Sequence, residues 1–354
     1  MKTLDTLNPK GKIILVRTDY NVPIKDGAVD GDLRLRASFP TIEYLKKKGA
    51  KKIILISHLG RPEGTRKPEL SLKPVAKRLA ELLEGTPVNF VDDVSGPDVE
   101  SAVASLKPGA ILLLENLRFF PGEEKNSESF AEEIVDSIHP DAFVQDGFAV
   151  IHRAHASTDA ITRLVPSYAG LLVESEVEKL SAVKNNPKKP LVILIGGAKV
   201  DDKQPLIDKF KTVADKILVG GKIAADGFSS IDKNVLVAED FDEDAEGAKL
   251  DIGPKSTADF VGALKSAKTV IWNGTMGKVE DSAFSTASEI ICRVLGENPD
   301  INSVICGGDT TSFVESEQKK HPELNFSLVS TGGGAALEFL VKPTLPGLAA
   351  LEEA

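Results

Sequence analysis

The sequence predicts an α/β protein with two domains, each a mainly parallel sheet flanked by helices, joined by a helix. Two observations support this prediction. Short β-branched or aliphatic runs recur along all 354 residues, and segments with helical periodicity separate many of them. The length of the chain and the number of these runs also exceed what one typical doubly wound sheet and one hydrophobic core hold.

The candidate strands share short aliphatic compositions bounded by polar or glycine residues. They are KIILVRTD, KKIILIS, VNFVDD, AILLLEN and AFVQD in the first half, and LVILIGG, KILVGG, NVLVAED, TVIWNG, SVICGGD and FSLVST in the second. Helical spacing is clearest from Ser71 to Gly85, where Ser71 is the expected N-cap and Gly85 the expected end. A strand followed by a helix, repeated, predicts parallel sheets with helices on both faces.

The expected domain boundary lies between Tyr168 and Pro190. A helical pattern from Leu171 to Val183 is followed by a polar, proline-containing stretch and then by a new strand. We therefore expect an N-terminal domain over 1–168, an interdomain helix and linker over 169–189, and a C-terminal domain over 190–340. The acidic run from Glu239 to Asp251 is expected to be a solvated face.

Composition excludes several classes of protein. The chain is 42% hydrophobic and 27% charged, and no apolar run approaches the roughly 20 residues of a membrane span. The first residues lack the pattern of a signal peptide, so we expect a cytoplasmic protein that binds no membrane. Cys292 and Cys306 have no partner at metal-ligand spacing. A net charge of −10 disfavours a nucleic-acid partner, so any bound anion needs a local basic cluster.

Basic and polar residues follow the candidate strands of the first half, where ligands of open α/β sheets bind. They are Asp19, Asn21, Arg34, His58, Gly60, Arg61, Asn116, Arg118, Asp146, His152, Arg153 and His155. Any one of these residues alone is most simply a solvated loop residue. Several arginines at one edge of an acidic protein instead predict a site for a small and highly anionic molecule, because the guanidinium group suits carboxylate and phosphate oxygens.

Glycine dominates the same positions in the second half. The segments are IGGAKVDDK, VGGKIA, WNGTMGKVE, CGGDTTSF and STGGGAALEFL, the last containing Gly332, Gly333 and Gly334 at a strand-to-helix turn. Such glycines serve either close packing or the approach of phosphate to backbone amides at a helix N-terminus. Asp309 is a natural Mg²⁺ partner there.

Several catalytic motifs are absent from the sequence. It contains no P-loop, no G-x-G-x-x-G, no G-x-S-x-G and no H-E-x-x-H. Phosphoryl transfer between two bound anions needs none of them, because positioning and charge neutralisation carry most of that catalysis. The glycine-rich turns are therefore interpreted as phosphate sites.

In order along the chain, the segments VRTDYNVP, GAKKIILISHLGRPEG, LLLENLRFF, HRAHAS, GGAKVDDK, DIGP, WNGTMGKVE, GGDT and STGGGAALEFL resemble phosphoglycerate kinase, from about Val16 to Gly347. The resemblance implies two Rossmann-like domains joined by a hinge helix, with 341–354 returning to the N-terminal domain. It also implies reversible phosphoryl transfer from 1,3-bisphosphoglycerate to ADP, giving 3-phosphoglycerate and ATP, in a glycolytic, cytoplasmic and monomeric enzyme.

The resemblance also implies which residues bind the substrates. The phosphoglycerate site would comprise Asp19, Asn21, Arg34, His58, Arg61, Arg118 and Arg153. The nucleotide site would comprise Gly197, Lys199, Lys203, Gly221, Asn273, Glu280, Gly307, Gly308, Asp309 and Thr310, with Glu280 on the ribose and Asp309 positioning Mg²⁺. Arg34, Lys199, Lys203, Gly332, Gly333 and Gly334 would meet the charge of the moving phosphoryl group. Hinge bending would occur near 171–190 and near the STGGG turn.

The chain departs from the family pattern in the second half. Cys306, Thr275 and Lys278 replace the usual residues of their motifs, GGKIAADGF stands where the adenine wall is expected, and the stretch 228–249 is shorter than usual. One alternative is therefore a catalytically weakened homologue that binds phosphoglycerate or a protein partner. A nicotinamide-dependent oxidoreductase is disfavoured by the missing glycine fingerprint.

Overall fold

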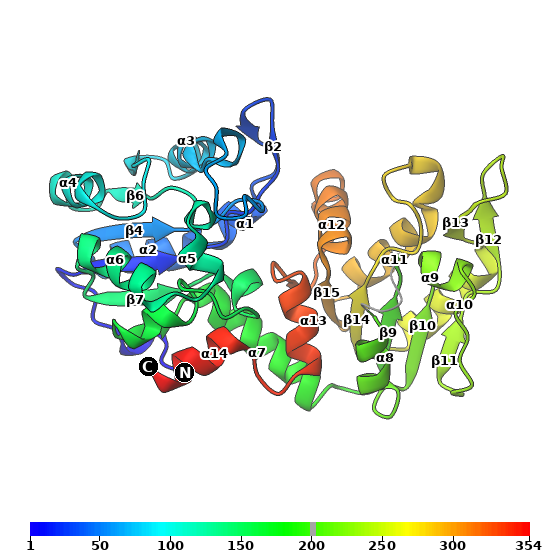
Figure 1. Cartoon of the computed structure of the whole chain (residues 1–354). Helices are drawn as coiled ribbons and strands as arrows, with labels where there is room; N and C mark the ends of the chain where they lie inside the picture. The colour runs from blue at the N-terminus through cyan, green and yellow to red at the C-terminus, as the bar shows by residue number, and fades with distance from the viewer. Residues whose placement is uncertain (199–202) are drawn as a thin grey trace. The chain divides into compact units, whose positions relative to one another are not determined.

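The structure is a computed structural model that describes residues 1–198 and 203–354. The chain folds as two units (Figure 1). The first unit comprises Met1–Ser175 and Thr344–Ala354, and the second comprises Glu176–Pro343. Each contains a six-stranded parallel sheet among the described residues, which confirms the predicted fold class.

The first unit is built on a sheet whose strands run parallel in the order β5-β6-β4-β1-β7-β8. These strands are β1 (Ile13–Arg17), β4 (Lys52–Ile56), β5 (Val88–Phe90), β6 (Ile111–Leu113), β7 (Ala142–Gln145) and β8 (Ser167–Ala169). In the central register Ile14 pairs with Ile53 on one side and with Ala142 on the other. Strand β8 is not among the predicted strands, because three residues with a serine give no aliphatic run.

Helices cover both faces of this sheet, as the alternating pattern predicts. The helices are α1 (Leu33–Ala37), α2 (Phe39–Lys47), α3 (Lys73–Leu82), α4 (Pro97–Ser105), α5 (Pro121–Glu124), α6 (Glu128–Ile138) and α14 (Pro346–Glu353), with 3-10 turns at Leu4–Thr6, Pro68–Leu70, Leu117–Phe119, Phe148–Val150 and Ala160–Arg163. Ile14 and Ile53 pack with α2 and α3, whereas Leu15 and Ile54 pack with α4 and α6. Alternate residues of each strand therefore serve two separate cores.

The expected cap of the helix in 71–85 is wrong by one residue. Helix α3 begins at Lys73 and its N-cap position is Leu72, whose side chain makes no capping bond. The Ser71 side chain still caps the helix from one position earlier, because its Oγ accepts the Lys73 N–H at 3.2 Å. Glu115, two residues after β6, supplies a second cap: its carboxylate accepts the Leu72 N–H at 2.8 Å and the Ser71 hydroxyl at 2.7 Å. Sequence reasoning places caps locally, and this cap comes from a residue 43 positions away.

The second unit repeats the architecture with the parallel order β11-β10-β9-β14-β15-β16. Its strands are β9 (Leu191–Ile195), β10 (Lys216–Val219), β11 (Val235–Val237), β14 (Thr269–Asn273), β15 (Asn302–Cys306) and β16 (Leu328–Val329). Its helices are α8 (Gln204–Phe210), α9 (Gly221–Ala225), α10 (Pro254–Lys265), α11 (Thr286–Gly296), α12 (Gly308–Lys320) and α13 (Gly334–Val341), with a 3-10 turn at Ser282–Phe284. Buried Trp272, Phe260 and Ile291 lie in one core between this sheet and its helices.

Two antiparallel hairpins are outside the sequence prediction. One is β2 (Ile24–Lys25) with β3 (Ala28–Val29), and the other is β12 (Phe241–Glu243) with β13 (Lys249–Ile252). The second hairpin lies in the acidic run that was expected to be a solvated face. Most of that run is exposed, but Asp251 is 2% exposed and its carboxylate accepts the N–H groups of Ile252 and Ala287, so this part of the prediction is wrong.

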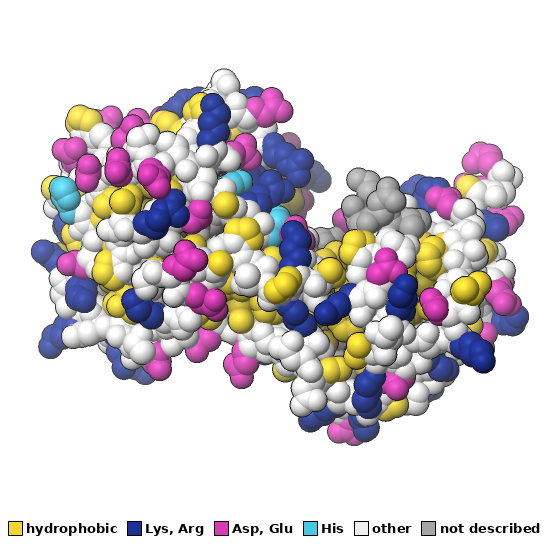
Figure 2. All heavy atoms as spheres, turned by 60° about the horizontal axis from the view of Figure 1, so that its bottom comes forward, with side chains coloured by type: hydrophobic (Ala, Val, Ile, Leu, Met, Phe, Trp, Pro, Cys, Tyr) yellow, Lys and Arg dark blue, Asp and Glu magenta, His cyan; other side chains and the backbone are white. Residues whose placement is uncertain are grey.

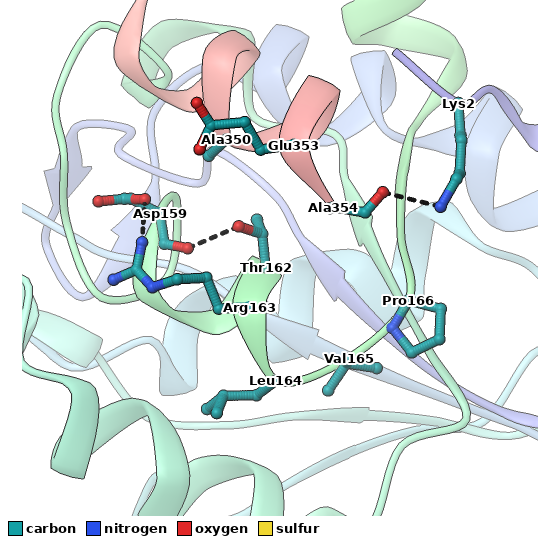
Figure 3. A pocket seen from close by; sticks show the side chains of 10 residues that line it. All are labelled: Lys2, Asp159, Thr162, Arg163, Leu164, Val165, Pro166, Ala350, Glu353 and Ala354. Carbon is teal, nitrogen blue, oxygen red and sulfur yellow. Dashed lines mark hydrogen bonds and ion pairs between the residues drawn. The ribbon is translucent and has the colours of Figure 1, made fainter.

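Helix α7 (Leu171–Asn185) carries the chain from the first unit into the second, and the boundary falls after Ser175. The chain returns to the first unit at Thr344, and α14 packs there: Gly347 N–H donates to Ile151 O at 2.8 Å and Lys2 Nζ donates to Ala354 O at 2.7 Å (Figure 3). The binding roles of the two units remain predictions at this stage. Within the described residues, every helix is too short or too polar to span a membrane.

Candidate functional site

The predicted basic residues of the first unit all lie past the carboxyl ends of its strands. Asp19 and Asn21 follow β1, His58 follows β4, Arg118 follows β6 and Arg153 follows β7. In Figure 2, Lys and Arg side chains of this unit gather beside His side chains on one part of its surface. The topology brings these residues together because neighbouring parallel strands end at the same edge of the sheet.

Asp19 organises the centre of this edge. It is 6% exposed, forms an ion pair with Arg34 from α1, and lies 3.8 Å from His58 Nδ1. Its other contact is local, from the Asn21 N–H at 3.2 Å. A buried carboxylate thus fixes Arg34, so Asp19 serves to position this arginine rather than to attract an anion.

His58 is neutral in this environment. It is 3% exposed, and burial, reinforced by the positive charges of Arg17, Arg118 and Arg34, lowers its pKa well below the ordinary value. Arg17 donates to His58 Nδ1 at 3.2 Å, which makes Nδ1 the acceptor nitrogen. His58 therefore carries its proton on Nε2 and offers one N–H donor without a charge.

Arg118 is held in place, whereas Arg61 and Arg153 are exposed. Arg118 is 5% exposed, donates to Gly60 O at 2.9 Å and lies 3.3 Å from Glu124. The same turn is tied to the strand β1 edge by the Gly60 N–H, which donates to Asn21 Oδ1 at 2.9 Å. Neither Arg61 nor Arg153 forms an ion pair with a carboxylate of the described residues, so both guanidinium groups can bind an external anion.

Sequence reasoning missed Arg17 and Glu123, which support this edge from below. Both are 0% exposed. Arg17, inside β1, donates to Ser157 Oγ at 2.7 Å, and Glu123 accepts both the N–H and the hydroxyl of Ser157. Burial acts to raise the pKa of Glu123, but hydrogen bonding to His155 and the charge of Arg17 hold it below the ordinary value. The sequence signal that could have identified Arg17 is a charged residue that directly follows an apolar run, in KIILVR.

The second unit brings its predicted glycines to one edge as well, and most of them are required by packing. A Cβ on Gly196 would lie 2.2 Å from Thr275 O, and one on Gly274 would lie 2.1 Å from Gly196 O. A Cβ on Gly221 would lie 2.7 Å from Gly197 N. The ends of β9, β10 and β14 therefore approach each other so closely that only glycine fits, with or without a ligand.

Asn273 and Thr310 link β14 to the start of α12. The Asn273 amide Nδ2 donates to Cys306 O at 2.9 Å, and Gly274 N–H donates to Thr310 Oγ1 at 2.7 Å. Because Nδ2 must face that carbonyl, the orientation of the amide is determined, and Oδ1 of this fully buried residue has no partner among residues 1–198 and 203–354. A buried acceptor with no donor is a polar group available to a ligand at this edge.

The glycines at the starts of α12 and α13 differ from the packed ones. A Cβ on Gly308, Gly333 or Gly334 would meet no atom within 4 Å. Gly332 is different again, because its N–H already donates to Ser330 Oγ at 3.0 Å. The amides of Gly333 and Gly334 have no acceptor among the described residues, and they open the N-terminus of a helix.

Glu280 and Asp309 line one pocket of about 290 Å³ between α11 and α12. Both carboxylates are exposed, and Phe313 supplies an apolar wall. Lys203 lies close enough to Cys306 to lower the pKa of its thiol, against the larger effect of burial. Lys199 lies outside the described residues. Among the described residues, Glu280 and Asp309 share this pocket, and Asp309 and Thr310 lie in the first turn of α12.

Two cavities of the first unit contain none of the predicted site residues. One, of about 480 Å³, is lined by the chain ends and 159–166 (Figure 3). The other, of about 550 Å³, lies between Arg66, Phe119 and the start of α3. Neither collects the convergent arginines and histidine of the basic edge.

A family model described as phosphoglycerate kinase matches residues 4–235 and 223–342. A phosphoglycerate kinase from Moorella thermoacetica is 40% identical over 396 aligned positions, covering 99% of each chain. One from Akkermansia muciniphila is 39% identical, covering 99% of this chain and 98% of the relative. The alignment with the Moorella thermoacetica enzyme covers 396 positions, more than the 354 residues of this chain, so it contains gaps in this chain. The two matches to the family model overlap at residues 223–235. Both findings agree with a shortened stretch after β10.

Solved structures agree with these matches. The phosphoglycerate kinase of Pyrococcus horikoshii has a TM-score of 0.88 at 27% identity, and that of Coxiella burnetii has 0.80 at 31% identity; each covers 99% of this chain and 98% of the solved one. The match to this two-domain fold therefore extends over nearly the whole length of this chain and of the solved ones. The chain therefore belongs to the phosphoglycerate kinase family, enzymes that transfer a phosphoryl group to and from a carboxyl group.

Proposed function

We propose that the basic edge of the first unit binds the phosphoglycerate and that the glycine-rich edge of the second unit binds the nucleotide. On this assignment Asp19, Asn21, Arg34, His58, Arg61, Arg118 and Arg153 form the first site. Gly197, Lys199, Lys203, Gly221, Asn273, Glu280 and 307–310 form the second. The reaction is reversible phosphoryl transfer from 1,3-bisphosphoglycerate to ADP, giving 3-phosphoglycerate and ATP.

The observation that carries this proposal is the pair of acceptor-free amides at Gly333 and Gly334. The positive φ of 51° at Gly333 favours glycine there, but neither packing nor backbone conformation requires glycine at Gly334. Amides at a helix N-terminus attract anionic oxygens, and a transferring phosphoryl group carries charge on three such oxygens. This turn is therefore the expected position of the group in transit.

The first site suits a molecule with a carboxylate and a phosphate. Arg61 and Arg153 provide exposed guanidinium groups that form no ion pair with a carboxylate of the described residues, and His58 provides a neutral Nε2–H donor. Arginine binds both kinds of oxygen in bidentate fashion, which orients the ligand as well as attracting it. Arg17 holds His58, Glu123 pairs with Arg17, and Asp19 pairs with Arg34, all without adding exposed negative charge.

The chemistry requires no general base in the direction of ATP formation. A β-phosphate oxygen of ADP attacks the acyl phosphate, the P–O bond to the acyl group breaks, and the electron pair leaves on a carboxylate that needs no proton. Arg34, Lys203 and the Gly333 and Gly334 amides would neutralise charge on the moving group, together with Lys199. This agrees with the absence of a nucleophile and base pair from the sequence.

The residues present fit a Mg²⁺ ion that arrives with the nucleotide. Asp309 is an exposed carboxylate at the first turn of α12, and the described residues contain no cluster of three metal-binding side chains. Mg²⁺ commonly binds through one carboxylate and substrate phosphates and keeps several waters. The ion would supply charge neutralisation, and Asp309 would hold it.

Transfer requires the two substrates to meet, so we infer that the units move relative to one another about α7 and about the turn at Thr331. Excluding water from the closed site would also prevent hydrolysis of the acyl phosphate. A monomeric and cytoplasmic enzyme is part of the same proposal.

A coupled assay with 3-phosphoglycerate and MgATP tests the assignment. Arg34→Ala and Lys203→Ala should each lower kcat by about 10²-fold or more, the scale of losing one charge-stabilising donor. Matched controls are Arg163→Ala and Lys211→Ala, which remove exposed ion-paired side chains of the same units and should leave kcat within about twofold. Equal activities in the site variants and the controls would refute the assigned roles.

A further inference from the structure

Asp146 is a buried carboxylate that the proposed mechanism does not use. It directly follows β7 and is 0% exposed. Its backbone N–H donates to Arg17 O at 2.8 Å, and the chain continues from it into the loop that carries Arg153. Asp146 therefore lies where the strand edge of the first unit meets the basic loop.

One oxygen of this carboxylate holds the start of α7. Oδ1 accepts the Thr41 hydroxyl at 2.8 Å and the Leu172 N–H at 3.1 Å, while the Leu171 N–H donates to Thr41 Oγ1 at 2.9 Å. Two of the four unpaired N–H groups of the helix are thus satisfied by Asp146, which follows β7, and by Thr41 of α2. The contact is a tertiary N-cap.

The contact also leaves no room for a side chain at Gly170. A Cβ on Gly170 would lie 2.1 Å from Asp146 Oδ1, so the chain can enter α7 only as glycine at this position. Only the first turn of α7 belongs to the first unit, because the boundary between the units falls after Ser175. The Asp146 cap is therefore a point at which the helix that crosses this boundary is attached to the first unit.

The second oxygen of Asp146 has no partner. Oδ2 is buried and accepts no hydrogen bond within the described part of the chain. The neighbouring titratable group is the Tyr20 phenol, which burial keeps protonated. Burial, opposed only by the bonds from Thr41 and Leu172, raises the pKa of Asp146 to about 8, and no positive charge from β1, α2 or α7 contributes.

An unpartnered buried oxygen is tolerable on a neutral carboxyl and costly on an ionised one. Ionisation would be favoured if the first turn of α7 opened and admitted water to Oδ2. We propose that Asp146 is a positioning residue of this enzyme: its neutral carboxyl holds the first turn of α7 to the first unit, and its ionisation releases that turn and slows phosphoryl transfer. This inference rests on the proposed function, which requires movement about α7.

The test is the pH profile of the full-length enzyme with 3-phosphoglycerate and MgATP. The parent should lose kcat as the pH rises through about 8, while KM for 3-phosphoglycerate stays within about twofold, because Asp146 touches no proposed ligand. Asp146→Asn, which cannot ionise, should lack this loss. Thr41→Val removes a bond that lowers the pKa of Asp146, so its loss of kcat should move to higher pH.

Two further measurements keep the proposal testable if Asp146→Asn does not fold. Gly170→Ala should lower kcat at every pH, because its Cβ displaces Oδ1. Amide exchange of residues 171–175, corrected for the intrinsic rate, should speed up as the pH rises toward about 8 and level off above that pH, in the parent alone. The same alkaline loss in Asp146→Asn, or unchanged exchange at 171–175, would overturn the proposal. A parent with no turnover at any pH would instead count against the proposed function, and the exchange result would still decide the role of Asp146.

Discussion

Replacing Gly334 by alanine should separate ligand binding from stability. The new Cβ would meet no atom within 4 Å, and the backbone of Gly334 has no positive φ that alanine would strain. Alanine also has the higher helix propensity, by up to about 1 kcal/mol in a helix interior and less at the first position. The free energy of unfolding should therefore stay within about 1 kcal/mol of the parent value.

Activity should respond quite differently. A methyl group in front of the Gly334 amide occupies the space through which a phosphoryl oxygen would approach. Loss of one preorganised N–H donor in a transition state costs about 10²- to 10³-fold in kcat, and a partly displaced contact should cost about 10-fold or more. The coupled assay with 3-phosphoglycerate and MgATP measures kcat, and urea unfolding measures stability.

Gly196→Ala is the matched control with the opposite expectation. Its Cβ would lie 2.2 Å from Thr275 O, 2.6 Å from Met276 Cε and 2.7 Å from Gly274 O, and two of these atoms are backbone. Overpacking of this kind costs about 3 kcal/mol or more, so this variant should lose stability together with activity. If Gly334→Ala keeps the parent kcat and KM, the turn does not bind the transferring group.

Three further measurements test the electrostatics. Glu123→Gln should destabilise the first unit by about 3 kcal/mol in urea unfolding, because it removes the carboxylate that contributes most to stabilising the buried charge of Arg17. Exposed Glu128→Gln is the control and should change stability by less than about 0.5 kcal/mol. Burial raises the pKa of Glu176 to about 6, so the native state keeps a proton that the unfolded state has lost. The free energy of unfolding should therefore fall by about 2 kcal/mol as the pH rises from about 4.5 to above 6, and a parent slope equal to that of Glu176→Gln would contradict this. The His58 ring should show no titration by NMR between about pH 6 and about pH 8, since its pKa lies well below the ordinary range.

Local patterns were sufficient for the sheets. The eleven aliphatic runs all became strands, because a strand buried on both faces is a nearly continuous apolar segment. Strand β8 and the two hairpins were not predicted, because none of their strands, which have two to four residues, lies in a longer aliphatic run. The contribution of Glu115 to the cap of α3 was not predicted for another reason: Glu115 is distant in sequence, and only the tertiary fold brings it to Leu72.

The candidate site shows the same division between local and tertiary information. Residues that follow strands could be predicted, because the strand ends define one edge. Arg17 and Glu123 could not, since one lies inside a strand and the other in a short helix. Residue type also failed to separate the glycines by role: Gly196 and Gly334 look alike in sequence, and only the distances to neighbouring atoms show that one is packed and the other open.

A chain of net charge −10 can present a basic edge because its counter-charges lie beneath that edge. Asp19 and Glu123 are buried, and they pair with Arg34 and Arg17. Arg61 and Arg153 remain exposed without such partners, so the outward potential is positive although the buried layer is close to neutral. Field lines from exposed charges reach an approaching anion, whereas a buried pair screens itself at short range. It follows that neutralising a buried carboxylate should cost stability, whereas neutralising Arg61 or Arg153 should weaken anion binding with little effect on folding.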